Sequence, residues 1–120
     1  MRTLTIRIQP DALAALEQAG QQFTQAWDSG TYAGEFMSFE SPASLFRLLT
    51  PARWTVLEEL QRAGPCSLRG LARQLDRDAS AVHRDVATLI ERGLIEKNAD
   101  GQLFVPYGRI HTEFDLAKAA

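Results

Sequence analysis

Apolar and polar positions repeat with two different periods in the first third of the chain. Residues 3–9 alternate between apolar and polar side chains, which predicts a half-buried strand. Residues 11–29 then carry apolar side chains at helical spacing, and residues 34–40 loosely alternate again. We therefore predict a β-α-β unit over residues 1–40. It is too small to bury both faces of its own sheet, so we expect it to dimerise or to bind a partner.

The rest of the chain is divided by residues that start and stop helices. Four segments with helical spacing each begin at a side chain that can cap a helix. These capping residues are Ser41, Thr50, Ser67 and Asp78. The longest of the last three segments, Asp78–Arg92, ends at Gly93, and a hairpin is predicted around residues 98–101. Alternation over residues 109–116 predicts a final strand, available to pair with the N-terminal unit.

The order of these elements predicts the fold class. A helix, a short helix, a three-residue break, a longer helix and a hairpin form the pattern of a winged helix-turn-helix. The small side chain of Ala72 lets two helices cross closely, and an apolar seam joins them. We predict an α+β fold in which a winged helix-turn-helix domain with a C-terminal strand, residues 41–120, follows the N-terminal unit.

The helix Asp78–Arg92 is predicted to enter the major groove of DNA. Its outer face has small side chains at its N-terminal end, which allow close approach to base edges. Arg84 is the candidate for a bidentate contact with guanine, and arginines near the preceding helix are candidates for phosphate contact. The arginines of that preceding helix could equally form a solubilising face. The full set of candidate DNA contacts is Ser67, Arg69, Arg73, Arg77, Ser80, Ala81, His83, Arg84, Thr88 and Lys97.

Charge qualifies this prediction. The net charge of −2 argues against binding by bulk electrostatics, but groove reading depends on where the positive charges lie. Residues 1–49 hold three basic and five acidic side chains, whereas residues 50–120 hold ten of each. Asp76 and Asp78 lie near the predicted DNA surface, so we expect weak monomeric binding and a functional homodimer. Asp85 is expected to hold Arg84 or an arginine of the preceding helix.

Several classes of function are not expected. No apolar run is long enough to span a membrane, and the N-terminus does not have the pattern of a signal peptide, so we expect a cytoplasmic protein. The single cysteine, Cys66, cannot form an internal disulfide, and the two histidines have no companion at metal-ligand spacing. We expect no catalytic residues, no metal and no cofactor. Cys66 is either a redox-sensitive thiol or an ordinary semi-buried cysteine.

Several short segments resemble known regulators. One set resembles MarR-like and ArsR-like winged-helix regulators: Leu71–Leu75, Ala81–Val86 and Leu89–Glu96. A second set resembles a prokaryotic family of short regulators that includes TumA-type antitoxins, encoded beside a ribonuclease toxin called TumE: Phe39–Pro42, Leu48–Pro51 and Val82–Val86. The second resemblance implies a homodimer that represses its own operon and neutralises a toxin.

The chain departs from the usual pattern at Asp76, where the turn commonly has glycine, and at Arg77, where an apolar residue is common. Two alternatives therefore stay open. One is a stand-alone repressor, and the other is a winged-helix interaction module that does not bind DNA.

Overall fold

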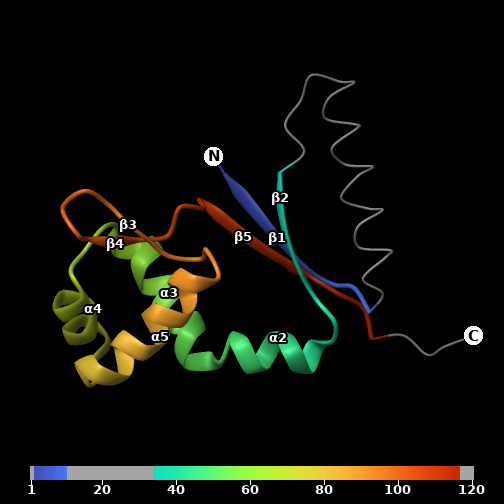
Figure 1. Cartoon of the computed structure of the whole chain (residues 1–120), viewed down its shortest axis with the longest axis horizontal. Helices are drawn as coiled ribbons and strands as arrows, with labels where there is room; N and C mark the ends of the chain where they lie inside the picture. The colour runs from blue at the N-terminus through green and yellow to red at the C-terminus, as the bar shows by residue number, and fades with distance from the viewer. Residues whose placement is uncertain (1, 11–33, 117–120) are drawn as a thin grey trace, which may run out of the picture. The chain divides into compact units, whose positions relative to one another are not determined.

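The computed structural model describes residues 2–10 and 34–116 of the 120-residue chain. Figure 1 shows helices and short strands, so the fold is α+β as predicted. The chain divides into two compact units. Unit 1 comprises residues 1–48 together with 109–120, and unit 2 comprises residues 49–108.

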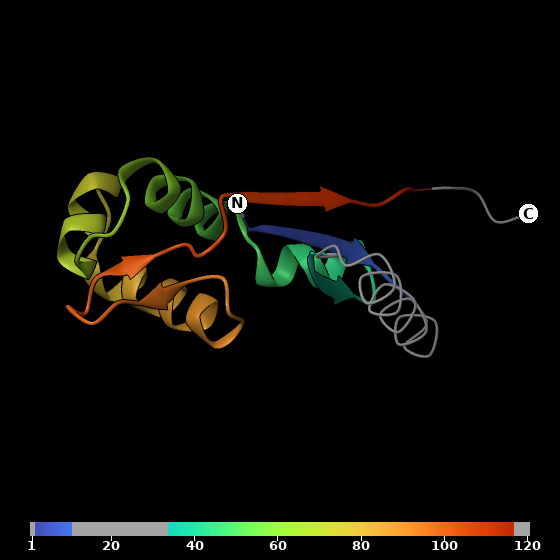
Figure 2. The ribbon, with the colours of Figure 1, turned by 90° about the horizontal axis from the view of Figure 1, so that it is seen from above.

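Unit 1 is built on a parallel sheet of three strands. β1 (Thr3–Ile8) lies in the middle, with β2 (Glu35–Phe39) on one side and β5 (Arg109–Glu113) on the other. Figures 1 and 2 show these strands side by side, although β5 lies about a hundred residues after β1 in the sequence. The helix α2 (Pro42–Leu48) follows β2 and contacts it. The core side chains of unit 1 are Leu4, Ile6, Phe39 and Leu45.

Unit 2 contains three helices and a hairpin. α3 (Pro51–Ala63), α4 (Leu68–Leu75) and α5 (Ala79–Glu91) each contact the other two. β3 (Glu96–Lys97) and β4 (Leu103–Phe104) pair antiparallel, and a further β-bridge joins Cys66 to Leu103. The segment between α3 and α4 is thereby tied to the hairpin. The most deeply buried side chains are Leu49, Val56, Leu57, Leu60, Leu71, Val82, Leu89, Leu94, Ile95 and Leu103.

The helices begin where the capping residues predict. A side-chain oxygen of each cap accepts a hydrogen bond from a backbone N–H in the first turn, at 3.0–3.3 Å. The caps are Ser41, Thr50, Ser67 and Asp78. At the other end of α5, Gly93 has a φ of 79°, a left-handed conformation that glycine adopts without steric cost. These predicted helix boundaries are confirmed.

The turn between α4 and α5 forms without a glycine. Asp76 adopts φ 52° and ψ 48° and is the one non-glycine residue with positive φ in the described part of the chain. Aspartate tolerates this conformation better than most side chains do. The residue that ends α4 is therefore left-handed although it is not the usual glycine. Next to it, the Arg77 N–H donates to the Ala72 carbonyl at 3.0 Å.

The division of the chain differs from the predicted one. We predicted a boundary after residue 40, but the structure groups α2 and β5 with the N-terminal strands. The physical reason is pairing, because β5 joins β1 in parallel and α2 packs on β2. The two predicted strands of the N-terminal unit are confirmed. The predicted helix over residues 11–29 lies outside the described residues.

Candidate functional site

The exposed face of α5 is the first part of the candidate site. Ser80, His83, Arg84 and Ala87 are exposed along this face. The opposite side of the helix is buried in the core of unit 2 and holds Val82, Val86 and Leu89. This split follows directly from the helical spacing of apolar side chains. It leaves one polar face of α5 open to a partner.

Two of the predicted contacts on α5 lie further round the helix. Ala81 and Thr88 are partly buried. The Thr88 hydroxyl donates to the Arg84 carbonyl at 3.2 Å, so its proton is used within the helix. The residues that the structure brings together at the N-terminal half of α5 are therefore Ser80, His83 and Arg84.

Two hollows border this face of α5. One, of about 440 Å³, is lined by Leu68 of α4 and by Ala79, Ser80, His83 and Arg84 of α5. The other, of about 290 Å³, lies against the hairpin and is lined in part by His83, Ala87, Lys97 and Gly101. His83 borders both hollows. The start of α4, the exposed face of α5 and the hairpin therefore border two neighbouring hollows, and we call the residues that line them, together with the exposed side chains of α4 and β3 beside them, the α5 surface.

Three predicted cations are available at or near this surface. Arg69 and Arg73 are exposed on α4, and Lys97 is exposed on β3. Within the described residues, neither these side chains nor Arg84 forms an ion pair. Exposed and unpaired guanidinium groups retain their full capacity to bind a phosphate or a base edge.

Arg77 lies in a different environment. Its Nη2 lies 2.9 Å from Oδ2 of Asp85, and Nε of Arg53 lies 3.0 Å from Oδ1 of the same carboxylate. The Asp85 side chain is only 14% exposed, and Nη1 of Arg77 is enclosed without a hydrogen-bond partner. Asp85 therefore holds Arg77 and Arg53 rather than Arg84. Sequence reasoning missed Arg53, because it lies 32 residues from Asp85 and no local pattern links them.

The first backbone amides of α4 and α5 are largely satisfied within the chain. Oγ of Ser67 accepts from the Gly70 N–H, and Oδ2 of Asp78 accepts from the N–H groups of Ser80 and Ala81. Free N–H groups at the start of a helix can bind a phosphate. The capping side chains already accept hydrogen bonds from these three N–H groups, so we expect side chains to make most of the phosphate contacts there.

Two charged groups on α3 are paired with each other. Arg62 and Glu59 form an ion pair on α3, which lowers the pKa of the Glu59 carboxyl and raises the pKa of the Arg62 guanidinium. Unit 2 holds eight basic and eight acidic side chains. Asp85 and Glu59 are already engaged, and of the other acidic side chains Asp76 and Asp78 lie between α4 and α5 while Glu96 and Asp100 lie on the hairpin.

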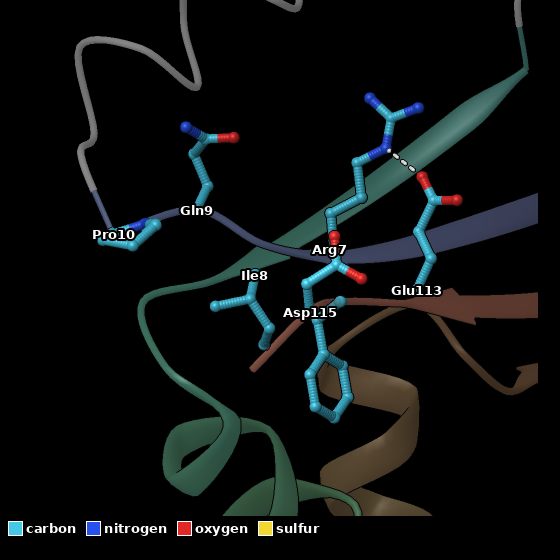
Figure 3. A pocket seen from close by; sticks show the side chains of 7 residues that line it. Arg7, Ile8, Gln9, Pro10, Glu113 and Asp115 are labelled. Carbon is cyan, nitrogen blue, oxygen red and sulfur yellow. Dashed lines mark hydrogen bonds and ion pairs between the residues drawn. The ribbon is translucent and has the colours of Figure 1, made fainter. Parts of the chain in front are cut away.

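Unit 1 has a hollow of its own, of about 580 Å³, at the ends of β1 and β5 (Figure 3). Arg7 on β1 and Glu113 on β5 form an ion pair across the two strands, with Nε of Arg7 3.0 Å from Oε1 of Glu113. Hydrogen bonds from His111 and then Arg7 hold the pKa of the Glu113 carboxyl below its ordinary value. Because these charges neutralise one another, this hollow is a weaker candidate site than the α5 surface.

The described residues contain neither a cluster of metal ligands nor a membrane-spanning helix. In residues 2–10 and 34–116, no three His, Cys, Asp or Glu side chains gather in a way that could hold a metal ion. Among the helices described, none combines the length and the apolar character needed to cross a membrane.

Comparison with protein-family models gives a match over the second half of the chain. Residues 48–112 match the model of a family described as HVO_A0114. This span is more than half of the chain and contains all of α3, α4, α5 and the hairpin. The α5 surface therefore lies wholly inside the matched region. No curated protein matches the chain.

Proposed function

We propose that this chain, which belongs to the HVO_A0114 family, is a winged helix-turn-helix protein that binds double-stranded DNA and regulates transcription. In this proposal α4 and α5 are the helix-turn-helix, α5 reads the major groove, and the β3–β4 hairpin is the wing. The mutual packing of the three helices supports this reading, as does the tie between Cys66 and Leu103 at the base of the hairpin.

One observation carries the proposal. The exposed face of α5 combines a hydrogen-bonding set, Ser80, His83 and Arg84, with the small side chains of Ala79 and Ala87. The major groove is about 12 Å wide, so a helix approaches base edges only where its side chains are small. Arg84 has no ion-pair partner in the described residues, so its guanidinium can make a bidentate contact with guanine. In this proposal the phosphate contacts are made by Arg69, Arg73 and Lys97.

The proposal is tested by selecting duplexes from a random pool and measuring the affinity of variants for the selected sequence. We expect Arg84→Ala to lower the affinity by about 5- to 150-fold, which corresponds to about 1–3 kcal/mol for a bidentate base contact. Arg73→Ala should weaken binding to all duplexes alike and reduce the salt slope by about one. Arg62→Ala, which removes an equal charge on α3, is the control. Equal affinities for wild type and Arg84→Ala would contradict the proposal.

Antitoxin activity is a second candidate function, favoured by one feature of unit 1. The Phe46 side chain on α2 is 53% exposed and the Phe114 side chain is 41% exposed, and their rings meet edge to face at 6.3 Å. Exposed aromatic side chains are typical of protein-binding surfaces. Co-expression with the product of the adjacent gene tests this role. Neutralisation of a ribonuclease that is lost in Phe46→Ser would support it, and no effect of the chain on that product would refute it.

A further inference from the structure

β5 is an edge strand with one side unpaired. It is the last strand in the order β2-β1-β5, and along its outer side no other strand of the described residues pairs with it. Figure 2 shows it running along one border of the sheet. An edge strand presents a row of free N–H and C=O groups that can pair with another strand.

The outward-facing groups of β5 can be identified from its register. The Arg109 N–H donates to the Arg2 carbonyl, and Arg109 lies opposite Thr3 of β1. Because successive residues of a strand direct their N–H and C=O groups to opposite sides, Arg109, His111 and Glu113 face β1. The backbone groups of Ile110 and Thr112 therefore point away from the sheet.

The charges of β5 are arranged to complement a second copy running in the opposite direction. Arg109, His111 and Glu113 lie on one face of the sheet, with the basic side chain at the start of the strand and the acidic one at its end. If two β5 strands pair antiparallel about a two-fold axis at His111, each Arg109 lies opposite the Glu113 of the other copy and joins Arg7 and His111, which already contact that carboxylate within its own chain. The same register places Ile110 opposite Thr112, so that their outward N–H and C=O groups meet as a hydrogen-bonded pair.

We propose that β5 pairs antiparallel with β5 of a second copy of this chain, about a two-fold axis at His111, so that the two sheets become one continuous sheet. In this register, every residue of β5 lies opposite a residue of β5 in the other copy. The opposite edge of the sheet offers no such match, because self-pairing of β2 would place Glu35 opposite the buried Phe39. The inference does not depend on DNA binding.

Cross-linking tests the register. In an antiparallel pair, opposed residues that do not hydrogen-bond have Cα atoms about 4.5 Å apart, within the range that a disulfide spans. In a Cys66→Ala background, we expect His111→Cys to form a disulfide-linked dimer under mild oxidation. Thr112→Cys should not, because this register places the two Thr112 residues opposite Ile110. Cross-linking of Thr112→Cys but not of His111→Cys would overturn the register.

Sedimentation velocity over a concentration series tests the pairing itself. Thr112→Pro removes an outward N–H while sparing the bonds to β1, since proline is tolerated on the free side of an edge strand. We expect this variant to be monomeric with an unchanged circular dichroism spectrum, while the matched control Thr112→Val still dimerises.

A charge reversal that leaves the backbone intact keeps the proposal falsifiable if Thr112→Pro fails to fold. Arg109→Glu replaces two opposite-charge pairs with two like-charge pairs, and we expect it to raise the dimer Kd by about tenfold or more. Arg62→Glu, with the same change of charge on α3, should leave the Kd unchanged. A wild-type chain that stays monomeric at all concentrations, or an Arg109→Glu variant that dimerises like wild type, would overturn the proposal.

Discussion

Cys66 is a half-buried thiol at the point where the segment before α4 meets the hairpin. Its N–H donates to the Leu103 carbonyl at 3.1 Å, and its carbonyl accepts from the Leu103 N–H at 2.8 Å. Burial and, to a smaller extent, the nearby Glu59 carboxylate raise the pKa of the Cys66 thiol. The folded chain therefore holds the thiol proton more tightly than a free cysteine does, and less thiolate is present near neutral pH. This direction favours an ordinary structural cysteine over a redox-sensitive one.

Because the thiolate is the nucleophile, we predict slow alkylation of Cys66. At about pH 7.5, below the ordinary pKa of a cysteine, iodoacetamide should react with the folded chain more slowly than with glutathione. The rate should keep rising at pH values where the glutathione rate has levelled off. Glu59→Gln should react somewhat faster than wild type, because it removes a nearby negative charge. Faster reaction of wild-type Cys66 than of glutathione would contradict the prediction.

The identity of Asp76 alone did not determine the backbone conformation of the turn between α4 and α5. Resemblance to other regulators predicts glycine in the turn, so an aspartate left the geometry of the turn open. The structure gives Asp76 the left-handed conformation that glycine would take. Aspartate also occurs in other turn conformations, which is why its identity alone does not specify this one. The consequence for function is electrostatic, because a carboxylate now lies near the start of α5.

At the scale of elements, one carboxylate connects three parts of unit 2. Asp85 on α5 binds Arg53 on α3 and Arg77 in the turn after α4. We predict that Asp85→Asn destabilises the chain by about 1–3 kcal/mol, because it leaves two partly buried guanidinium groups without their charged acceptor. Urea denaturation followed by circular dichroism measures this change. Glu91→Gln, an exposed substitution on the same helix, should stay within about 0.5 kcal/mol of wild type. Equal effects of the two substitutions would contradict the prediction.

The elements that could be predicted are those determined by nearby residues. Caps such as Thr50 and Asp78 and the terminator Gly93 act within one helical turn, so their positions in the sequence fix the helix ends. The ion pairs of Asp85 and the parallel pairing of β1 with β5 join residues that are distant in sequence. Alternation predicts that such strands exist but does not specify which neighbour each one takes. This is also why helical spacing could predict which side of α5 is exposed, while Arg53 was missed.

At the scale of the whole molecule, the division into two units separates two proposed tasks. The α5 surface belongs to unit 2, and the proposed self-pairing strand belongs to unit 1. The sequence suggested this separation from the acidic surplus of its first 49 residues. The last strand was predicted to be available to pair with the N-terminal unit, but its parallel register beside β1 was not, because that pairing spans nearly the whole chain.

This separation allows dimerisation and DNA binding to be uncoupled. With Asp76 and Asp78 beside the α5 surface and no net positive charge on unit 2, a single copy has little sequence-independent attraction to phosphate. Two linked copies bind two half-sites with a gain set by their effective concentration. We predict that Thr112→Pro lowers the affinity for a duplex with two half-sites by about tenfold or more, and leaves the affinity for a single half-site unchanged. Fluorescence anisotropy with the two duplexes measures both values.

The two duplexes distinguish the possible failures. Thr112→Val, which keeps the outward N–H, should bind both duplexes like wild type. If Thr112→Pro loses affinity for both duplexes equally, the substitution has disturbed unit 2 and the uncoupling is contradicted. If wild type binds two half-sites no more tightly than one, the dimer adds nothing to DNA binding, even where cross-linking at His111 succeeds. The proposed β5 pairing and the proposed contact of Arg84 with a base are then tested separately, since each depends on a different surface of the chain.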